Sequence, residues 1–207
     1  MMDRRVVAVF FAGGTLLPLC AHAQMVEFTP HTGMYTPVGL LVEGVAETDN
    51  SFFRRKQLGS LMIGTRMALR ANHTFGLEGS LAYTPSLVAI TDRDQTVDVG
   101  GAVTLASLRP VLRVHGRVAQ GMWSFHLAPG VGLVHRSGSA WNGTGGTTDR
   151  AFVLAAGWRL GRSNSAFRFD IEDYITRAAF RDASVLSAPR LHHDVIWSFG
   201  LSIPMTR

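Results

Sequence analysis

Residues 192–205 have the sequence HHDVIWSFGLSIPM, in which apolar side chains occupy every second position. The apolar set is Val195, Trp197, Phe199, Leu201, Ile203 and Met205, and between them lie Asp194, Ile196, Ser198, Gly200, Ser202 and Pro204. A period of two over this length indicates a β-strand with one apolar face. A strand that contacts lipid on one side and a lumen on the other needs this pattern over about 9–11 residues. The stretch therefore predicts the last strand of a transmembrane β-barrel.

The N-terminus has the three parts of a secretory signal peptide. Asp3-Arg4-Arg5 is charged, Val6–Leu19 is almost entirely apolar, and Ala21-His22-Ala23 is an A-x-A cleavage site. The apolar run is too short for a membrane-spanning helix, which needs about 20 residues. We expect residues 1–23 to be the signal peptide and residues 24–207 to be an outer-membrane barrel domain. Lipidation of Cys20 is the alternative, which Leu19 disfavours because lipoprotein signals place Gly, Ala or Ser before the cysteine.

Composition excludes several classes of protein. The only cysteine is Cys20, so the mature chain is expected to have no disulfide and no thiolate metal site. The net charge of +5 and the pI near 10.3 come almost entirely from arginine, since Lys56 is the only lysine. These arginines are scattered rather than collected in a basic helix or an aromatic-basic cluster, so nucleic-acid binding is not expected. Arginines that line a lumen and its rims explain the charge better.

Eight alternating segments follow one another along the chain. They are Val26–Thr36, Ser60–Arg70, Phe75–Thr84, Thr96–Val114, Trp123–Leu133, Ala151–Leu160, Phe167–Ile175 and His192–Met205. The connections after the second, fourth and sixth segments are short, whereas the other four are long: Pro37–Gly59, Pro85–Gln95, Arg136–Asp149 and Arg181–Leu191. Transmembrane barrels have short periplasmic turns and long extracellular loops. We predict an all-β fold, a single eight-stranded antiparallel up-and-down transmembrane β-barrel.

The fourth segment changes phase along its length. Val97, Val99, Val103 and Leu105 are expected to face outward, after which Leu108, Leu112 and Val114 do so. One extra residue around Ala106–Leu108, a β-bulge, would explain the change. A soluble lipocalin-like or sandwich fold is the competing interpretation, but its apolar face would point into a core. Here the opposite face mixes Gly and Ala with charged residues, which suits a narrow lumen.

The stretch Ser198-Phe199-Gly200-Leu201-Ser202-Ile203-Pro204-Met205 resembles the C-terminal signal that the outer-membrane assembly machinery recognises. It departs from that pattern by ending in Met205-Thr206-Arg207 instead of a terminal aromatic residue. Together with the hairpin pattern over residues 24–207, it resembles the small bacterial outer-membrane β-barrel families of the opacity-protein and OmpX/OmpW-like kind. The resemblance implies a location in the bacterial outer membrane, contact with its lipid and lipopolysaccharide, and a monomer. Its members serve as adhesins, stress-related barrels, narrow passages or, rarely, lipid-modifying enzymes.

The inward positions carry many titratable side chains: Arg66, Arg70, Glu78, Asp98, His126, Arg159, Arg168, Asp170, Glu172 and Tyr174. An isolated buried charge costs several kcal/mol, so charges in a narrow lumen must pair or contact water. We predict a charge network that closes the lumen, formed by Arg66, Glu78, Arg159, Arg168, Asp170 and Glu172. In it Arg159 should lie near Arg168 and Asp170, and Arg66 should pair with Glu78. A polar passage is the alternative.

Catalytic and metal sites are not expected. Ser124 and His126 share a face, but that face points inward, whereas a lipid hydrolase needs these groups on the lipid side. His192 and His193 are adjacent and therefore point to opposite faces of a strand, which does not suit a metal. We predict that the protein is not an enzyme and has no cofactor.

The predicted function lies in the long loops. Pro37–Gly59 contains Phe52, Phe53, Arg54, Arg55 and Lys56, an apolar and cationic cluster that suits lipopolysaccharide phosphates or a partner. We expect a structural or surface-interaction barrel that acts through this loop and through Arg136–Asp149. A narrow channel for small solutes is the second hypothesis, and a lipid-modifying hydrolase is the third.

Overall fold

The computed structural model describes residues 25–45, 52–92, 95–118, 121–142, 147–162, 165–178 and 190–205. The expected signal peptide lies outside these residues. The strands are β1 (Met25–Val38), β2 (Val42–Val45), β3 (Phe52–Gln57), β4 (Ser60–Arg70), β5 (Phe75–Asp92), β6 (Gln95–Val118), β7 (Gly121–Ser137), β8 (Thr148–Arg162), β9 (Ser165–Ala178) and β10 (Arg190–Pro204). A 3-10 turn, η2 (Ser139–Trp141), follows β7. In these ranges no helix is long and apolar enough to cross a membrane.

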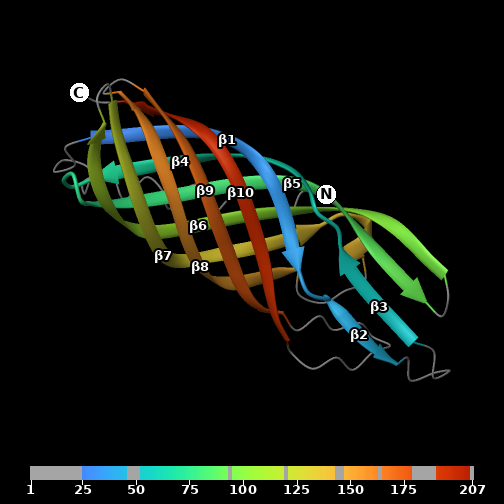
Figure 1. Ribbon diagram of the computed structural model, residues 1–207. Coiled ribbons are helices and arrows are strands. Elements are labelled where there is room, and N and C mark those ends of the chain that lie inside the picture. Colours follow the sequence, from blue (N-terminus) through green and yellow to red (C-terminus); the bar gives the residue numbers. More distant parts are fainter. Residues whose placement is uncertain are drawn as a thin grey trace, which may run out of the picture.

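Eight of the strands form a closed ring of antiparallel pairs. The order β5-β4-β1-β10-β9-β8-β7-β6 is closed by pairing between β5 and β6. In Figure 1 these strands lie side by side and tilted around one axis, as a barrel requires. The predicted eight-stranded antiparallel barrel is confirmed. The short turns after β4, β6 and β8 lie at the end where β1 begins and β10 ends.

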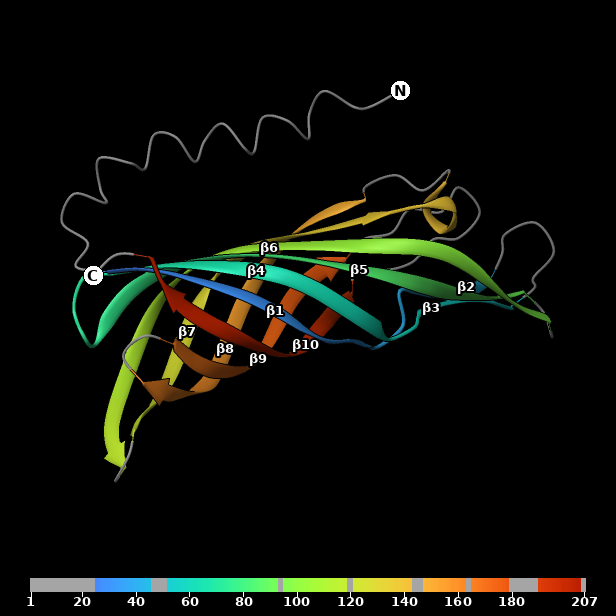
Figure 2. The ribbon, with the colours of Figure 1, turned by 90° about the horizontal axis from the view of Figure 1, so that it is seen from above.

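The opposite end of the barrel carries an extension that the sequence did not predict. Residues 85–92, expected in a loop, continue β5 and pair with β6 as far as Asp92↔Gln95. The expected loop Pro37–Gly59 contains β2 and β3, and β3 pairs with β5. Figure 2 shows β5 and β6 running beyond the other strands, with β2 and β3 beside them. The loop expectation was wrong because cross-strand hydrogen bonds continue wherever a partner is available, whatever the alternation of side chains.

The predicted bulge in β6 was also wrong. The partners of β6 on β5 and β7 keep one constant register on both sides of residues 106–108. Val103 and Leu105 are fully buried inside the barrel, while Leu108 is 46% exposed on its outside. The sequence suggested a phase change because an inward apolar residue was not expected. The barrel interior has an apolar layer, described below, and this layer accepts both side chains.

The outer wall is apolar, as predicted. Ile63, Val131 and Phe167 are 65–75% exposed, as a lipid-facing wall requires. Trp158 packs against Phe125 and Phe169 on this wall, with ring centroids 5.6 and 6.4 Å apart. The inner wall holds most of the buried charged residues, so the barrel is polar inside and apolar outside.

Candidate functional site

The middle of the lumen contains a closed ring of ion pairs, which we call the central ion ring. Its members alternate between cation and anion, and each contacts two neighbours: Arg66, Asp170, Arg168, Glu78, Arg109 and Glu172. They come from β4, β5, β6 and β9, so the ring spans the interior from one wall to the other. Their exposed side-chain fractions are 2% or less. Three cations balance three anions in a water-poor space.

The contacts of the central ion ring are short and specific. Arg109 lies 2.7 Å from Glu78 and 2.5 Å from Glu172. Asp170 lies 3.1 Å from Arg66 and 2.9 Å from Arg168. Glu172 also contacts Arg66, and Glu78 contacts Arg168. Guanidinium–carboxylate pairs of this kind are the strong, charge-assisted class of hydrogen bond.

Side chains outside the ring add further hydrogen bonds around it. His126 Nε2 lies 2.7 Å from Asp170 Oδ1, and Arg66 Nη2 donates to Ser198 Oγ at 2.6 Å. Tyr174 donates its hydroxyl to Ser107 Oγ at 3.2 Å. Hydrogen bonds of this kind make a buried polar network rigid.

A second polar layer lies toward the end with the short turns. Glu27 of β1 contacts Arg70 of β4, Arg159 of β8 at 2.9 Å and Arg113 of β6 at 3.8 Å. The four side chains are 1–16% exposed. One carboxylate therefore faces three guanidinium groups.

The lumen on the other side of the central ion ring is apolar and then polar again. The apolar layer consists of Tyr35, Met62, Ala82, Val103, Leu105, Val134, Ala151, Val153, Tyr174 and Ile196. Beyond it, Arg136 lies 2.7 Å from Asp194 and 3.0 Å from Asp149, and Tyr35 donates its hydroxyl to Asp194. Above these groups, an apolar cap of Leu41, Val88, Ala140 and Trp141 covers the end of the barrel, with Trp141 6.0 Å from the Arg136 guanidinium.

The structure brings together five of the six residues of the predicted network, which are Arg66, Glu78, Arg168, Asp170 and Glu172. Arg159 lies directly opposite Arg168 on the paired strands β8 and β9, as predicted, but its guanidinium contacts Glu27 in the neighbouring layer and not Asp170. The predicted pairing of Arg66 with Glu78 was wrong, since Arg66 contacts Glu172 and Asp170. Side chains in a narrow barrel meet across the lumen, so strand neighbours are not always partners.

The direction of two side chains on β6 was misjudged from the sequence. Arg109 was missed, although the outward positions Leu108 and Leu112 on either side of it require that it point inward. Asp98 was expected inward but is exposed, because it lies on the part of β6 that pairs with the extension of β5, at Ala89.

The predicted loop cluster lies on a strand. Phe52, Phe53, Arg54, Arg55 and Lys56 belong to β3. Arg54 and Lys56 are exposed, whereas Arg55 is half-buried. Because successive side chains point to opposite faces of a strand, Arg55 lies on the other face from Arg54 and Lys56, so these three cations do not form one continuous patch.

The serine and histidine residues considered for catalysis or metal binding lie on β7 and β10. His126 is engaged with Asp170 and Ser124 is buried nearer the short turns, so neither contacts the outer wall. His192 points inward and lies 3.2 Å from Asp194, while His193 points outward and lies 2.8 Å from Asp173. In the part of the chain that the structure describes, no group of three or more His, Cys, Asp or Glu residues could hold a metal ion.

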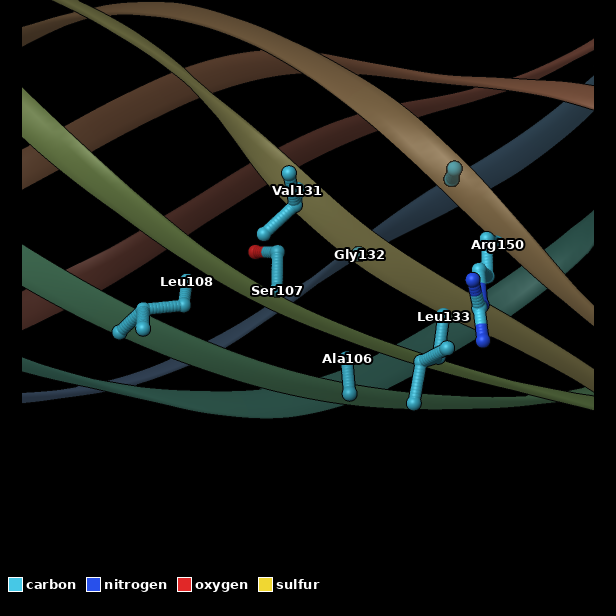
Figure 3. Close-up of a pocket in the computed structure, with 8 residues that line it drawn as sticks. Ala106, Ser107, Leu108, Val131, Gly132, Leu133 and Arg150 are labelled. Carbon is cyan, nitrogen blue, oxygen red and sulfur yellow. The ribbon is translucent and has the colours of Figure 1, made fainter.

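A shallow hollow of about 460 Å³ lies in the barrel wall between β6, β7 and β8. Figure 3 shows Leu108, Val131 and Leu133 along it, with Arg150 at one end. The pairing of β6 with β7 stops at Leu108↔Val131 and resumes at Leu112↔Leu127, and Pro110 and Pro129 lie between these two pairs. A proline has no N–H to donate to the ladder, which accounts for the gap.

Comparison with known structures supports the fold. The outer membrane protein OprG from Pseudomonas aeruginosa superimposes with a TM-score of 0.54 at 12% identity, over 88% of this chain and 97% of that one. Ail, the attachment invasion locus protein of Yersinia pestis, in complex with the heparin analogue sucrose octasulfate, superimposes with a TM-score of 0.43 at 14% identity, over 88% and 100% of the two chains. No protein-family model and no curated protein sequence matches this chain.

Proposed function

We propose that this chain is an integral protein of the bacterial outer membrane with a closed lumen and a structural or surface-interaction role. The apolar outer wall, the closed ring of eight strands and the OprG-like fold support insertion in that membrane. Residues 1–23 would direct export as a cleaved signal peptide. The short turns would face the periplasm and the extension of β2, β3, β5 and β6 the exterior. The terminal strand β10 would engage the assembly machinery.

The filled lumen carries this proposal. From one end to the other, the interior holds the Glu27 layer, the central ion ring, the apolar layer and the Arg136 layer beneath its cap. A barrel of about eight strands has an interior just wide enough for side chains to fill. A hydrated ion would have to displace paired charges and then cross apolar side chains. The second hypothesis, a channel for small solutes, would require these layers to move.

Conductance tests the closed lumen directly. The purified barrel, inserted in a planar bilayer, should give no steady single-channel current in salt solution, while a general porin in the same bilayer conducts. The inserted state is checked by its faster migration on gels when unheated. Steady currents from folded wild-type protein would refute the closed barrel and favour the channel.

The extracellular extension is the proposed contact surface. Arg54 and Lys56 are exposed on β3, and cations of this kind pair with the phosphates of lipopolysaccharide. Their placement on a paired strand fixes their spacing better than a loop would.

A pair of double variants tests this surface. Replacing both residues (Arg54→Ser, Lys56→Ser) should weaken binding of purified lipopolysaccharide to the barrel in uncharged detergent. The charge-preserving pair (Arg54→Lys, Lys56→Arg) should retain binding and serves as the matched control. Equal affinity of both double variants and the wild type would exclude this surface as the contact.

A further inference from the structure

The end of the barrel with the short turns is strongly basic. The residues at this end are Met25–Phe28, the segments around the three short turns, and the end of β10, and Glu27 is the only acid among them. Arg70, Arg113 and Arg159 gather around that single carboxylate. Three guanidinium groups against one carboxylate leave two positive charges unbalanced. The acids of the neighbouring layer do not offset them, because they already bind the three arginines of the central ion ring.

Two of these arginines, Arg70 and Arg159, border a pocket. A cavity of about 230 Å³ is lined by Met25, Arg70, His73, His115, Met122, Trp123, Ser124, Arg159, Gly161 and Ala166. His115, Ser124 and Arg159 are direct cross-strand neighbours on β6, β7 and β8, so they form a polar row along one wall. Met25, Met122 and Trp123 provide an apolar wall.

The arginines of this pocket have unused hydrogen-bonding capacity. The Nε atoms of Arg70 and Arg159 are buried and have no hydrogen-bond partner among the described residues. The Arg113 guanidinium lies 3.8 Å from Glu27, which is too long for a hydrogen bond. Arg113 does not line the pocket, but it adds its positive charge to this end of the barrel. A buried cation without full compensation is unfavourable, so an anion in the pocket would lower the free energy of the barrel.

We propose that this pocket is a binding site for a phosphate group, held by Arg70 and Arg159 with the Ser124 hydroxyl as a further donor. Guanidinium groups match the geometry of phosphate oxygens and bind them with charge-assisted hydrogen bonds. The apolar wall of Met25, Met122 and Trp123 would contact the carbon part of the bound molecule. A phospholipid headgroup of the inner leaflet and a soluble phosphate compound share this chemistry.

Binding to the full-length folded barrel in maltoside detergent, which contains no phosphate, tests the site. Inorganic phosphate and dihexanoyl phosphatidic acid are titrated separately by calorimetry. The double variant (Arg70→Gln, Arg159→Gln) should bind both about tenfold more weakly or worse than the control Arg150→Gln, which removes an exposed arginine of the outer wall. Tighter binding of the lipid than of inorganic phosphate identifies a headgroup site, whereas equal binding identifies a site for soluble phosphates.

A second variant separates binding from folding. Glu27→Gln removes the only carboxylate and should strengthen phosphate binding, because the anion no longer competes with it. A purely structural role of the cluster predicts no such gain.

If the double variant does not fold, the wild type should still unfold at a higher temperature in phosphate than in chloride of equal ionic strength. The proposal is overturned if the folded double variant binds like Arg150→Gln, if Glu27→Gln shows no gain, or if acetate displaces phosphate at equal concentration.

Discussion

Asp170 is the residue whose loss should disturb the lumen most clearly. Its carboxylate accepts contacts from three side chains: His126 at 2.7 Å, Arg168 at 2.9 Å and Arg66 at 3.1 Å. All of these groups are almost completely buried. The change Asp170→Ala opens the central ion ring and leaves three arginines against two acids, Glu78 and Glu172. Breaking a buried pair by removing one partner costs about 3–5 kcal/mol.

The control for this change is Asp98→Ala. Asp98 is exposed on β6 beyond the barrel, so its loss should alter stability by no more than about 0.5 kcal/mol. The variant Asp170→Asn keeps the shape and removes only the charge, which separates electrostatics from packing. Urea unfolding of the refolded barrel in lipid vesicles, followed by tryptophan fluorescence, measures the three free energies. If Asp170→Ala and Asp170→Asn both unfold like Asp98→Ala, the central ion ring does not hold the barrel together.

Two further predictions concern the walls of the barrel. Leu201→Arg, on the lipid side but close to the β8–β9 turn, should destabilise by less than the about 2–4 kcal/mol that arginine costs at the middle of the membrane. Ser202→Arg should also destabilise because Ser202 is buried and bonded to Thr29 at 2.8 Å. Urea unfolding measures both, and a Leu201→Arg variant as stable as the wild type would contradict the assigned face. Gly33→Ala should prevent formation of the heat-modifiable barrel, because a Cβ there would lie 1.9 Å from the Trp197 carbonyl oxygen on the paired strand β10. Gly79→Ala is its control, since the nearest atom to that Cβ is 3.9 Å away, and equal folding of both variants would refute the steric argument.

The sequence by itself determined the architecture and the two environments of the wall. Alternation with a period of two, as in β10, places side chains such as Trp197 and Leu201 outside and Ser198 and Ser202 inside, because successive side chains leave a strand on opposite faces. The order of short and long connections predicted the antiparallel ring. These properties depend only on neighbours along the chain, so they can be derived from it.

Only the tertiary structure decided which side chains meet inside. Arg66 and Glu172 are 106 positions apart and lie on strands that do not pair, yet they contact each other across the lumen. Glu27 likewise contacts arginines from three different strands. Val103 and Leu105 point inward into an apolar layer to which several other strands contribute. Contacts across a lumen depend on the tilt and relative shift of all eight strands. Alternation along one strand specifies a face but not a height in the barrel, so it cannot specify a partner.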